Sequence, residues 1–269
     1  MKIARLILPL LWLALPAWSH ELWIEPQAYQ VGKGATISAS LRNGQNFTGA
    51  DLAWFDGSIR SFQVHSGGKT RDLTGRAGDI PAVQDLKTQA GLTVLAYQSK
   101  PTVLTYETEE KFQTFLTHKD LIPSAATIHT APYAPPIREV FTRHSKSLIG
   151  VGHAKGADIA FGLETEFVAL ANPYRDDLTS GLPVRLLYQG IPRPNAQIEL
   201  FDRAPDGTVS ITLHRTDASG EALLPVTPGH TYLADAVVLR PPAPDLAERY
   251  RVDWQTLWAA LTFAVPLAD

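Results

Sequence analysis

The sequence of 269 residues contains no cysteine. We therefore expect no disulfide bond, no lipid anchor attached through cysteine and no thiolate metal site, and the chain must fold on its apolar core alone. Any metal site has to use nitrogen and oxygen ligands. Imidazole, amine and carboxylate groups suit Ni(II), Co(II), Cu(II) or Zn(II).

Runs of lysine and arginine are also absent, and the formal net charge is −3. A mildly acidic chain without runs of basic residues offers no basic patch for the phosphates of a nucleic acid, so we expect no nucleic-acid partner. After the first residues no apolar run approaches the roughly 20 residues that span a bilayer, so we do not expect the exported protein to be embedded in a membrane. Phosphate loops, dinucleotide-binding glycine motifs, nucleophile elbows and paired-carboxylate motifs are missing as well, which favours a binding protein over an enzyme.

The first nineteen residues have the layout of a secretory signal peptide. Lys2 and Arg5 give a positive start, residues 6–15 are apolar, and residues 17–19 place small side chains where signal peptidase cuts. We expect cleavage after Ser19, which leaves a mature chain of 250 residues with a formal net charge of −5. A short signal on a cysteine-free chain indicates a periplasmic protein.

Cleavage at this point makes His20 the first residue of the mature chain. Its α-amine and its imidazole Nδ1 can close a chelate ring on one transition-metal ion, which an internal histidine cannot do. The amine has an ordinary pKa of about 8, so it gives up its proton to a metal easily near neutral pH. Two ligands require one or two more, and the neighbouring Glu21 is a candidate. Alternatively, Glu21, Trp23 and Glu25 share one side of a strand and form a partly exposed edge.

Asp235 is the second candidate ligand, because residues 232–239 around it are apolar on both sides of the expected strand. A carboxylate in that position loses its hydration and needs a partner such as an arginine, an amine or a metal. An ion pair with Arg185 or Arg240 is the alternative to metal ligation. The seven other histidines form no short H-x-H or H-x-x-x-H cluster.

Short strands separated by turns dominate the expected secondary structure. Alternation of apolar and polar residues predicts a strand at residues 35–41. Short segments bounded by turn signals predict further strands at residues 59–65, 91–99, 182–189, 196–201, 209–215 and 231–240. Such successions of short strands are typical of immunoglobulin-like sandwiches.

Helical spacing of apolar residues occurs at residues 108–116 and 137–148, and Asp253 is placed to cap a turn or short helix. The sequence therefore predicts a mainly β fold of two immunoglobulin-like or transthyretin-like β-sandwich domains joined by a short helical segment. The expected boundaries are a signal peptide at 1–19, a first sandwich at 20–106, a helical linker region at 107–160 and a second sandwich at 161–269.

Five segments carry a resemblance to a known family: residues 20–26, 96–101, 110–112, 143–146 and 253–263, the first of which reads His-Glu-Leu-Trp-Ile-Glu-Pro. With them the chain resembles a family of exported bacterial proteins of nominally unknown function that are described as the periplasmic component of ABC-type cobalt or nickel transport systems. The second half also resembles the carboxypeptidase-regulatory or collagen-adhesin-B sandwich repeat. The family resemblance implies two β-sandwich domains, periplasmic residence and a link to metal uptake.

Together these observations predict periplasmic binding of a divalent transition metal, nickel or cobalt, as an accessory to metal uptake. The predicted metal ligands are His20, Glu21 and Asp235, and a membrane metal transporter is the candidate partner. Two alternatives stay open. One is a copper redox protein with a histidine brace, which needs a second histidine, and the other is a metal-free β-sandwich interaction module.

Overall fold

The computed structural model describes residues 21–128 and 135–267 of the chain. The predicted signal peptide and His20 precede the first described residue. Both predictions therefore lie outside the described residues.

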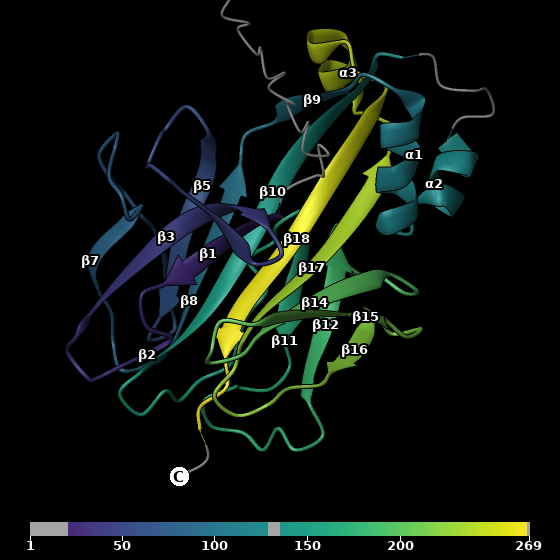
Figure 1. The fold of residues 1–269 in the computed structure, drawn as a ribbon. Coiled ribbons are helices and arrows are strands. Elements are labelled where there is room, and N and C mark those ends of the chain that lie inside the picture. The colour runs from purple at the N-terminus through teal and green to yellow at the C-terminus, as the bar shows by residue number, and fades with distance from the viewer. Residues whose placement is uncertain (1–20, 129–134, 268–269) are drawn as a thin grey trace, which may run out of the picture.

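One long sheet, the central sheet, runs through both halves of the described chain (Figure 1). Its strands follow the order β15-β14-β17-β18-β10-β8-β5-β6, and β2 and β9 also pair with β10. The bounds are β2 Gln30–Val31, β5 Ile59–Ser66, β6 Lys69–Asp72, β8 Gly91–Ser99, β9 Thr102–Tyr106, β10 Ile137–Val151, β14 Gln197–Arg203, β15 Val209–Arg215, β17 Thr231–Arg240 and β18 Trp254–Ala264. The pairing of β10 with β18 is parallel and joins the strands of the first half to those of the second.

Two smaller sheets cover the central sheet, one on each face. The N-terminal sheet consists of β1 Glu21–Pro26, β3 Thr36–Gln45, β4 Thr48–Leu52 and β7 Val83–Lys87, and the C-terminal sheet of β11 Thr165–Ala169, β12 Leu182–Tyr188, β13 Ile191–Pro192 and β16 Glu221–Leu224. Successive residues of a strand point to opposite faces. Leu148 of β10 packs with the C-terminal sheet and the next residue, Ile149, packs with the N-terminal sheet. The prediction of a mainly β fold with sandwich packing is confirmed, although the two sandwiches share one sheet.

The helices are α1 Glu109–His118, α2 Ile122–Ile128 and α3 Pro244–Tyr250. The helix expected at 108–116 is confirmed as α1. The hydroxyl of Thr108 accepts a hydrogen bond from the Lys111 N–H, and Glu109 and Glu110 occupy the first turn, where the helix dipole favours acidic side chains. The N-cap residue and the acidic first turn were therefore sufficient to locate the start of this helix in the sequence.

Strand β17 shows how α1 and β1 lie relative to each other. Leu233 packs into a small core with Trp23 of β1, and Val237 packs with Phe115 of α1. Residues 233, 235 and 237 share one face of the strand. Strand β1 and helix α1 therefore cover the same face of the central sheet, with Asp235 between them.

The helix expected at 137–148 is wrong, because these residues belong to strand β10. A strand that is covered on both faces loses the alternation that identifies strands, and its apolar residues then fit a helical spacing by coincidence. Arg143 and Lys146 would have been on the exposed side of such a helix, but they are only 6% and 0% exposed. The turn or helix after Asp253 is wrong for the same reason, since β18 begins at Trp254 and is buried along most of its length.

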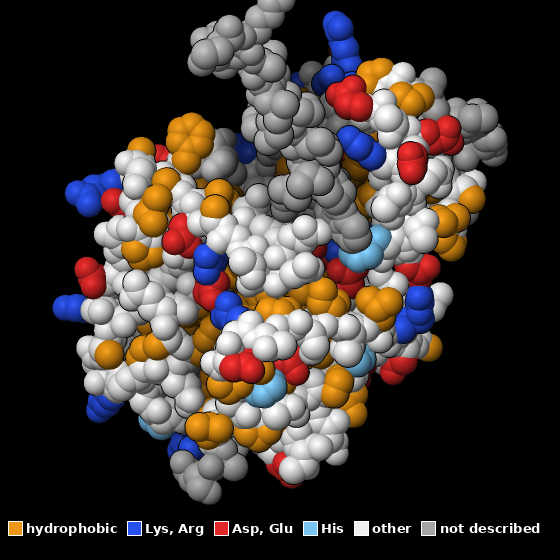
Figure 2. Space-filling model, in the orientation of Figure 1, with side chains coloured by type: hydrophobic (Ala, Val, Ile, Leu, Met, Phe, Trp, Pro, Cys, Tyr) orange, Lys and Arg blue, Asp and Glu red, His pale blue; other side chains and the backbone are white. Residues whose placement is uncertain are grey.

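The surface carries charges of both signs in the view of Figure 2, where acidic and basic side chains are interspersed among apolar ones. Within residues 21–128 and 135–267, no helix has the length and apolar character needed to cross a bilayer.

His144 of β10 gives a testable pH dependence of stability. Its Nδ1 lies 3.3 Å from the Trp258 carbonyl oxygen and its Nε2 lies 3.3 Å from Gln98 Nε2, and burial lowers its pKa to about 4. The unfolded chain binds this proton at a pKa of about 6.5, so the folded state loses stability as the pH falls from about 6.5 to about 4.

We expect wild type to lose about 2 kcal/mol more unfolding free energy than His144→Gln between about pH 7 and pH 4.5. Urea denaturation at both pH values measures the difference. His153→Gln, at an exposed position, serves as the control and should follow wild type. Parallel pH profiles of wild type and His144→Gln would contradict the argument.

Candidate functional site

Three buried carboxylates surround one lysine. Lys119 Nζ lies 2.8 Å from Glu199 Oε2, 3.1 Å from Asp235 Oδ2 and 3.4 Å from Glu21 Oε1. None of these four side chains is more than 4% exposed. We call the four residues the Lys119 cluster.

Each member of the cluster is positioned by a different element. Glu199 of β14 and Asp235 of β17 are direct partners in the antiparallel pairing of the two strands, so their side chains lie side by side on one face. Glu21 is the first residue of β1, which crosses over that face, and Lys119 follows the last residue of α1. The cluster therefore joins four segments that are far apart in the sequence.

Burial and the close approach of three carboxylates to one ammonium shift the pKa values of several members of the cluster. Burial raises the pKa of Glu21 to about 7, against the opposing effect of the Lys119 ammonium. Burial also raises the pKa of Glu199. Burial by itself would lower the pKa of Lys119, but Asp235, Glu199 and Glu21 together raise it above its ordinary value. The three carboxylates therefore keep Lys119 in its charged form.

The indole ring of Trp258 lies beside the cluster. Lys119 Nζ lies 4.8 Å and Arg143 Cζ lies 4.0 Å from the centroid of its ring, and Phe115 stacks on it with centroids 6.0 Å apart. The guanidinium of Arg143 is also close enough to act electrostatically on Asp235 and Glu21. Lys119 and Arg143 therefore both make cation–π contacts with the Trp258 ring, beside the three carboxylates of the cluster.

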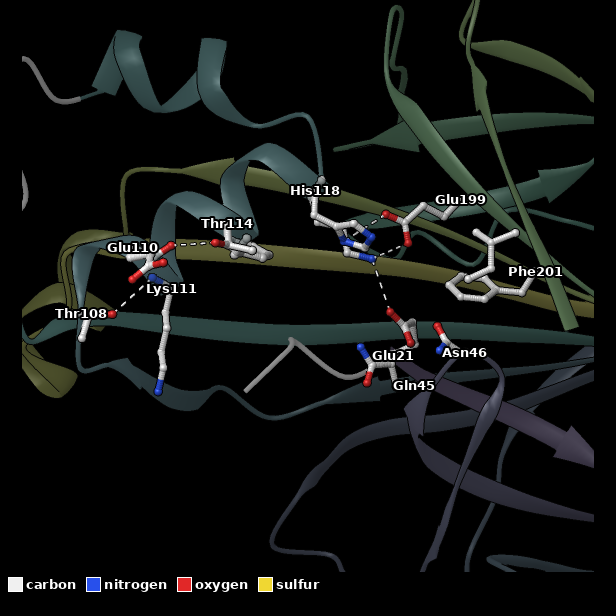
Figure 3. A pocket seen from close by; sticks show the side chains of 13 residues that line it. Glu21, Gln45, Asn46, Thr108, Glu110, Lys111, Thr114, His118, Glu199 and Phe201 are labelled. Atoms are coloured by element: carbon white, nitrogen blue, oxygen red, sulfur yellow. Dashed lines mark hydrogen bonds and ion pairs between the residues drawn. The ribbon is translucent and has the colours of Figure 1, made fainter. Parts of the chain in front are cut away.

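A cavity of about 380 Å³ opens beside the cluster. Figure 3 shows Glu21 and Glu199 pointing toward each other from β1 and β14, with His118 next to Glu199. His118 Nδ1 lies 3.6 Å from Glu199 Oε1. Within the described residues, the buried Oε2 of Glu21 and Oε1 of Glu199 have no hydrogen-bond partner. The cavity thus ends in carboxylate oxygens that retain capacity to bind a cation or a donor.

The structure brings together two of the three residues predicted as metal ligands, Glu21 and Asp235, on one ammonium. The third, His20, lies outside the described residues and is bonded to the backbone nitrogen of Glu21. The expectation of a partly exposed edge at Glu21 is wrong, since the residue is 3% exposed. The alternative prediction, an ion pair of Asp235 with Arg185 or Arg240, is also wrong. Arg185 pairs with Glu221, and Arg240 pairs with Glu164.

Sequence reasoning did not select Glu199, Lys119 or His118. Glu199 carried the same signal that singled out Asp235, since it stands among Ile198, Leu200 and Phe201 in a short strand. For Lys119 and His118 no comparable signal exists. Basic residues after a helix are ordinary, because they interact favourably with the carboxyl end of the helix.

A metal ion is compatible with the chemistry of this site but not with its present arrangement. Carboxylates, together with a nearby imidazole, are suitable ligands for divalent first-row metals. However, in the part of the chain that the structure describes, no group of three or more His, Cys, Asp or Glu side chains is arranged to hold a metal. The three carboxylates are instead spaced for an ammonium group.

These features define a mainly β protein with a buried acidic site at the end of a cavity. More particularly, the chain belongs to the DUF4198 family, a domain of unknown function, whose family model matches residues 17–240. Membership of this family carries no statement about metal transport. No curated protein matches the sequence.

Two solved structures show distant similarity. A tetra-tandem repeat in the extending region of a large adhesion protein is 9% identical, with 91% of this chain and 49% of that chain covered and a TM-score of 0.23. The chain therefore spans about half the length of that structure. The D0-D1 domain of intimin is 13% identical, with 90% and 97% covered and a TM-score of 0.19. Similarity at this level does not bear on the function of the chain.

Replacing the lysine tests the electrostatic description of the cluster. We expect Lys119→Met to lower the unfolding free energy by about 3 kcal/mol at about pH 7.5, because it leaves three buried carboxylates without their ammonium. The loss should be smaller at about pH 5. Burial raises the pKa values of Glu21 and Glu199, so at that pH both are more fully protonated and need less counter-charge.

Denaturant titrations at the two pH values measure the effect. Lys111→Met is the matched control, because this lysine lines the same cavity but is exposed, and its loss should cost less than about 0.5 kcal/mol. A pH-independent loss for Lys119→Met would argue that the lysine acts through packing rather than charge.

Proposed function

We propose that the mature protein binds a divalent transition metal, nickel or cobalt, through His20 together with Glu21 and Asp235, as a periplasmic accessory to metal uptake. The observation that supports this most directly is the meeting of Glu21 and Asp235. They are 214 positions apart in the sequence, and both contact Lys119. Glu21 directly follows His20, the residue of the proposed N-terminal chelate, in the sequence. Glu199 joins them as a ligand that the sequence did not suggest.

In this proposal His20 and the carboxylates contribute to metal binding in different ways. The α-amine and imidazole of His20 form a chelate that a free N-terminus makes possible, and the carboxylates add negative charge from a site with little access to water. Since the amine must lose its proton first, affinity rises with pH up to the ordinary amine pKa of about 8. Binding and release of an ion, without a chemical step, fit an accessory to a membrane transporter.

A copper site with a histidine brace is the second candidate, and one observation favours it. Such a brace needs an internal histidine, and His118 lies beside the cluster, with Nδ1 3.6 Å from Glu199 Oε1. If this candidate is right, His118→Ala removes the brace, whereas for nickel binding by His20 and carboxylates it has a smaller effect. The electron paramagnetic resonance spectrum of the copper-loaded protein distinguishes the two, since nitrogen hyperfine coupling from His118 should vanish in the variant.

The free N-terminus is the first prediction to test. Residues 20–269, produced with His20 as the first residue, should bind Ni²⁺ tightly in a calorimetric titration at about pH 7.5. One alanine added before His20 leaves every side chain in place but removes the chelate, and we expect at least a hundredfold weaker binding. Unchanged affinity in the extended protein would rule out the N-terminal chelate.

The carboxylates are tested separately. Glu21→Gln and Asp235→Asn each keep shape and remove one negative ligand, and we expect each to weaken Ni²⁺ binding about tenfold, which is about 1.4 kcal/mol. Glu110→Gln is the control, because Glu110 lines the outer part of the same cavity and is exposed. If Glu110→Gln weakens binding as much as Glu21→Gln does, the effect is general electrostatics and the cluster has no special part.

A further inference from the structure

We infer that the cavity beside the Lys119 cluster binds a small organic cation, with the ammonium group of the ligand on Glu21 and Glu199 and its apolar part along the aromatic and aliphatic side of the cavity. The ligand class is a primary amine that carries an aromatic or aliphatic group. This inference goes beyond the proposed metal binding and does not depend on it.

The polar end of the cavity has two acceptors that lack a donor. Glu21 and Glu199 both line the cavity, and they are only 3% and 2% exposed. Within the described residues, the buried Oε2 of Glu21 and Oε1 of Glu199 have no hydrogen-bond partner. His118 Nδ1 lies 3.6 Å from the second of these oxygens, which is too far for a hydrogen bond. A buried carboxylate oxygen without a donor is unfavourable, so a ligand that brings donors into the cavity is stabilised there.

Lys119 cannot supply the missing donors. Its Nζ donates to Oε1 of Glu21, Oε2 of Glu199 and Oδ2 of Asp235, at 3.4, 2.8 and 3.1 Å. An ammonium has three protons, so these three hydrogen bonds use all of them. Glu21 and Glu199 point toward each other in Figure 3 and each has one oxygen within 3.4 Å of the same nitrogen. Their second oxygens are therefore close enough for one further donor group to contact both.

The charges around the two glutamates favour a cationic donor over a neutral one. Hydrogen bonds between ionised groups are shorter and stronger than neutral ones. The charged groups that face one another here are three carboxylates, of Glu21, Glu199 and Asp235, and the two cations Lys119 and Arg143, which acts on them from β10. When all five are ionised, one monovalent cation balances the set, so the ligand's ammonium is accepted although Lys119 is near.

The remaining wall of the cavity is more apolar than polar. Phe115 of α1 and Phe201 of β14 line it, and Ile211 of β15 is the direct partner of Phe201 in the antiparallel pairing. Ile211 is 44% exposed, and Leu213, the partner of Glu199, is 62% exposed. Paired residues of neighbouring strands point to the same face. Exposed apolar side chains therefore lead from the surface of β15 toward the buried Glu199.

Size and composition also suit a small molecule. The volume of about 380 Å³ lies within the range of about 300–1,000 Å³ that is usual for ligand sites. The lining side chains come from β1, the turn after β3, α1, β14 and β15, so a bound molecule contacts five segments. A mostly apolar cavity with a few convergent polar groups is the usual form of a site for a small organic ligand.

A matched pair of ligands tests the inference on the wild-type protein. Calorimetric titrations of residues 20–269 in metal-free buffer at about pH 7.5 use phenethylamine, which is a cation at this pH, and phenethyl alcohol, which has nearly the same shape and no charge. We expect the amine to bind at least tenfold more tightly than the alcohol, because only the amine brings an ionised donor to the two carboxylates. Equal affinities, or no binding of the amine, would overturn the inference.

Substitutions then locate the ligand. Glu199→Gln keeps the shape of the side chain and removes its charge, and it should weaken binding of the amine at least tenfold. Ile211→Ser, at an exposed position, should weaken it about threefold through lost apolar contact. Glu110→Gln is the control, because this exposed glutamate lines the same cavity, and its affinity should stay within about twofold of wild type. Amine binding that is unchanged in both Glu199→Gln and Ile211→Ser would place the ligand elsewhere and refute the proposal.

The outcome is separate from that of the proposed function. If Glu199→Gln does not fold, Ile211→Ser and the comparison of the two ligands on wild type still decide the question. Nickel binding by a protein that does not bind phenethylamine refutes this inference alone. Binding of phenethylamine as described, by a protein that does not bind nickel, supports this inference and refutes the proposed function alone.

Discussion

The contact on which the described structure depends is the one between the Lys119 ammonium and three carboxylates. Burying four ionisable groups in one place is unfavourable unless each finds opposite charge, and losing one partner leaves the rest without compensation. Glu21, Glu199 and Asp235 lie in β1, β14 and β17, and Lys119 is the C-cap of α1. The first strand of the described chain, the helix and the C-terminal strands must therefore be correctly placed together for the site to exist.

A second buried lysine plays a structural part on the opposite face of the central sheet. Lys146 of β10 is fully buried, with Nζ 2.9 Å from Asp158 Oδ1, and it donates to the carbonyl oxygens of Ile159 and Phe167 at 2.7 and 2.8 Å. Its donors are all used, so it ties the segment before β11 to the sheet. Lys119 differs, because Glu21 and Glu199 beside it each keep one buried oxygen without a hydrogen-bond partner among the described residues.

Local pattern predicted much of the fold. Strand β3 and the capped helix α1 appear where alternation and capping placed them, because half-covered strands and helix starts leave a local signal. Strand β17 is buried on both faces and was found from the Pro228-Gly229 turn that precedes it. Strand β10 left none, since both of its faces are covered and its charged residues are buried in ion pairs and against Trp258. For the site, burial of a carboxylate in an apolar strand singled out Asp235, and position next to the N-terminus singled out Glu21.

By itself, the sequence determined a mainly β chain without sulfur ligands, a helix begun by Thr108, and an acidic residue at 235 that must have a partner. Only the tertiary structure decided that this partner is Lys119, that Glu21 and Glu199 share it, and that a cavity reaches them. The physical reason is that a buried charge requires compensation without specifying its source. Any cation in the chain can provide it, and the packing of β1 and α1 over one face of the central sheet selects which one does.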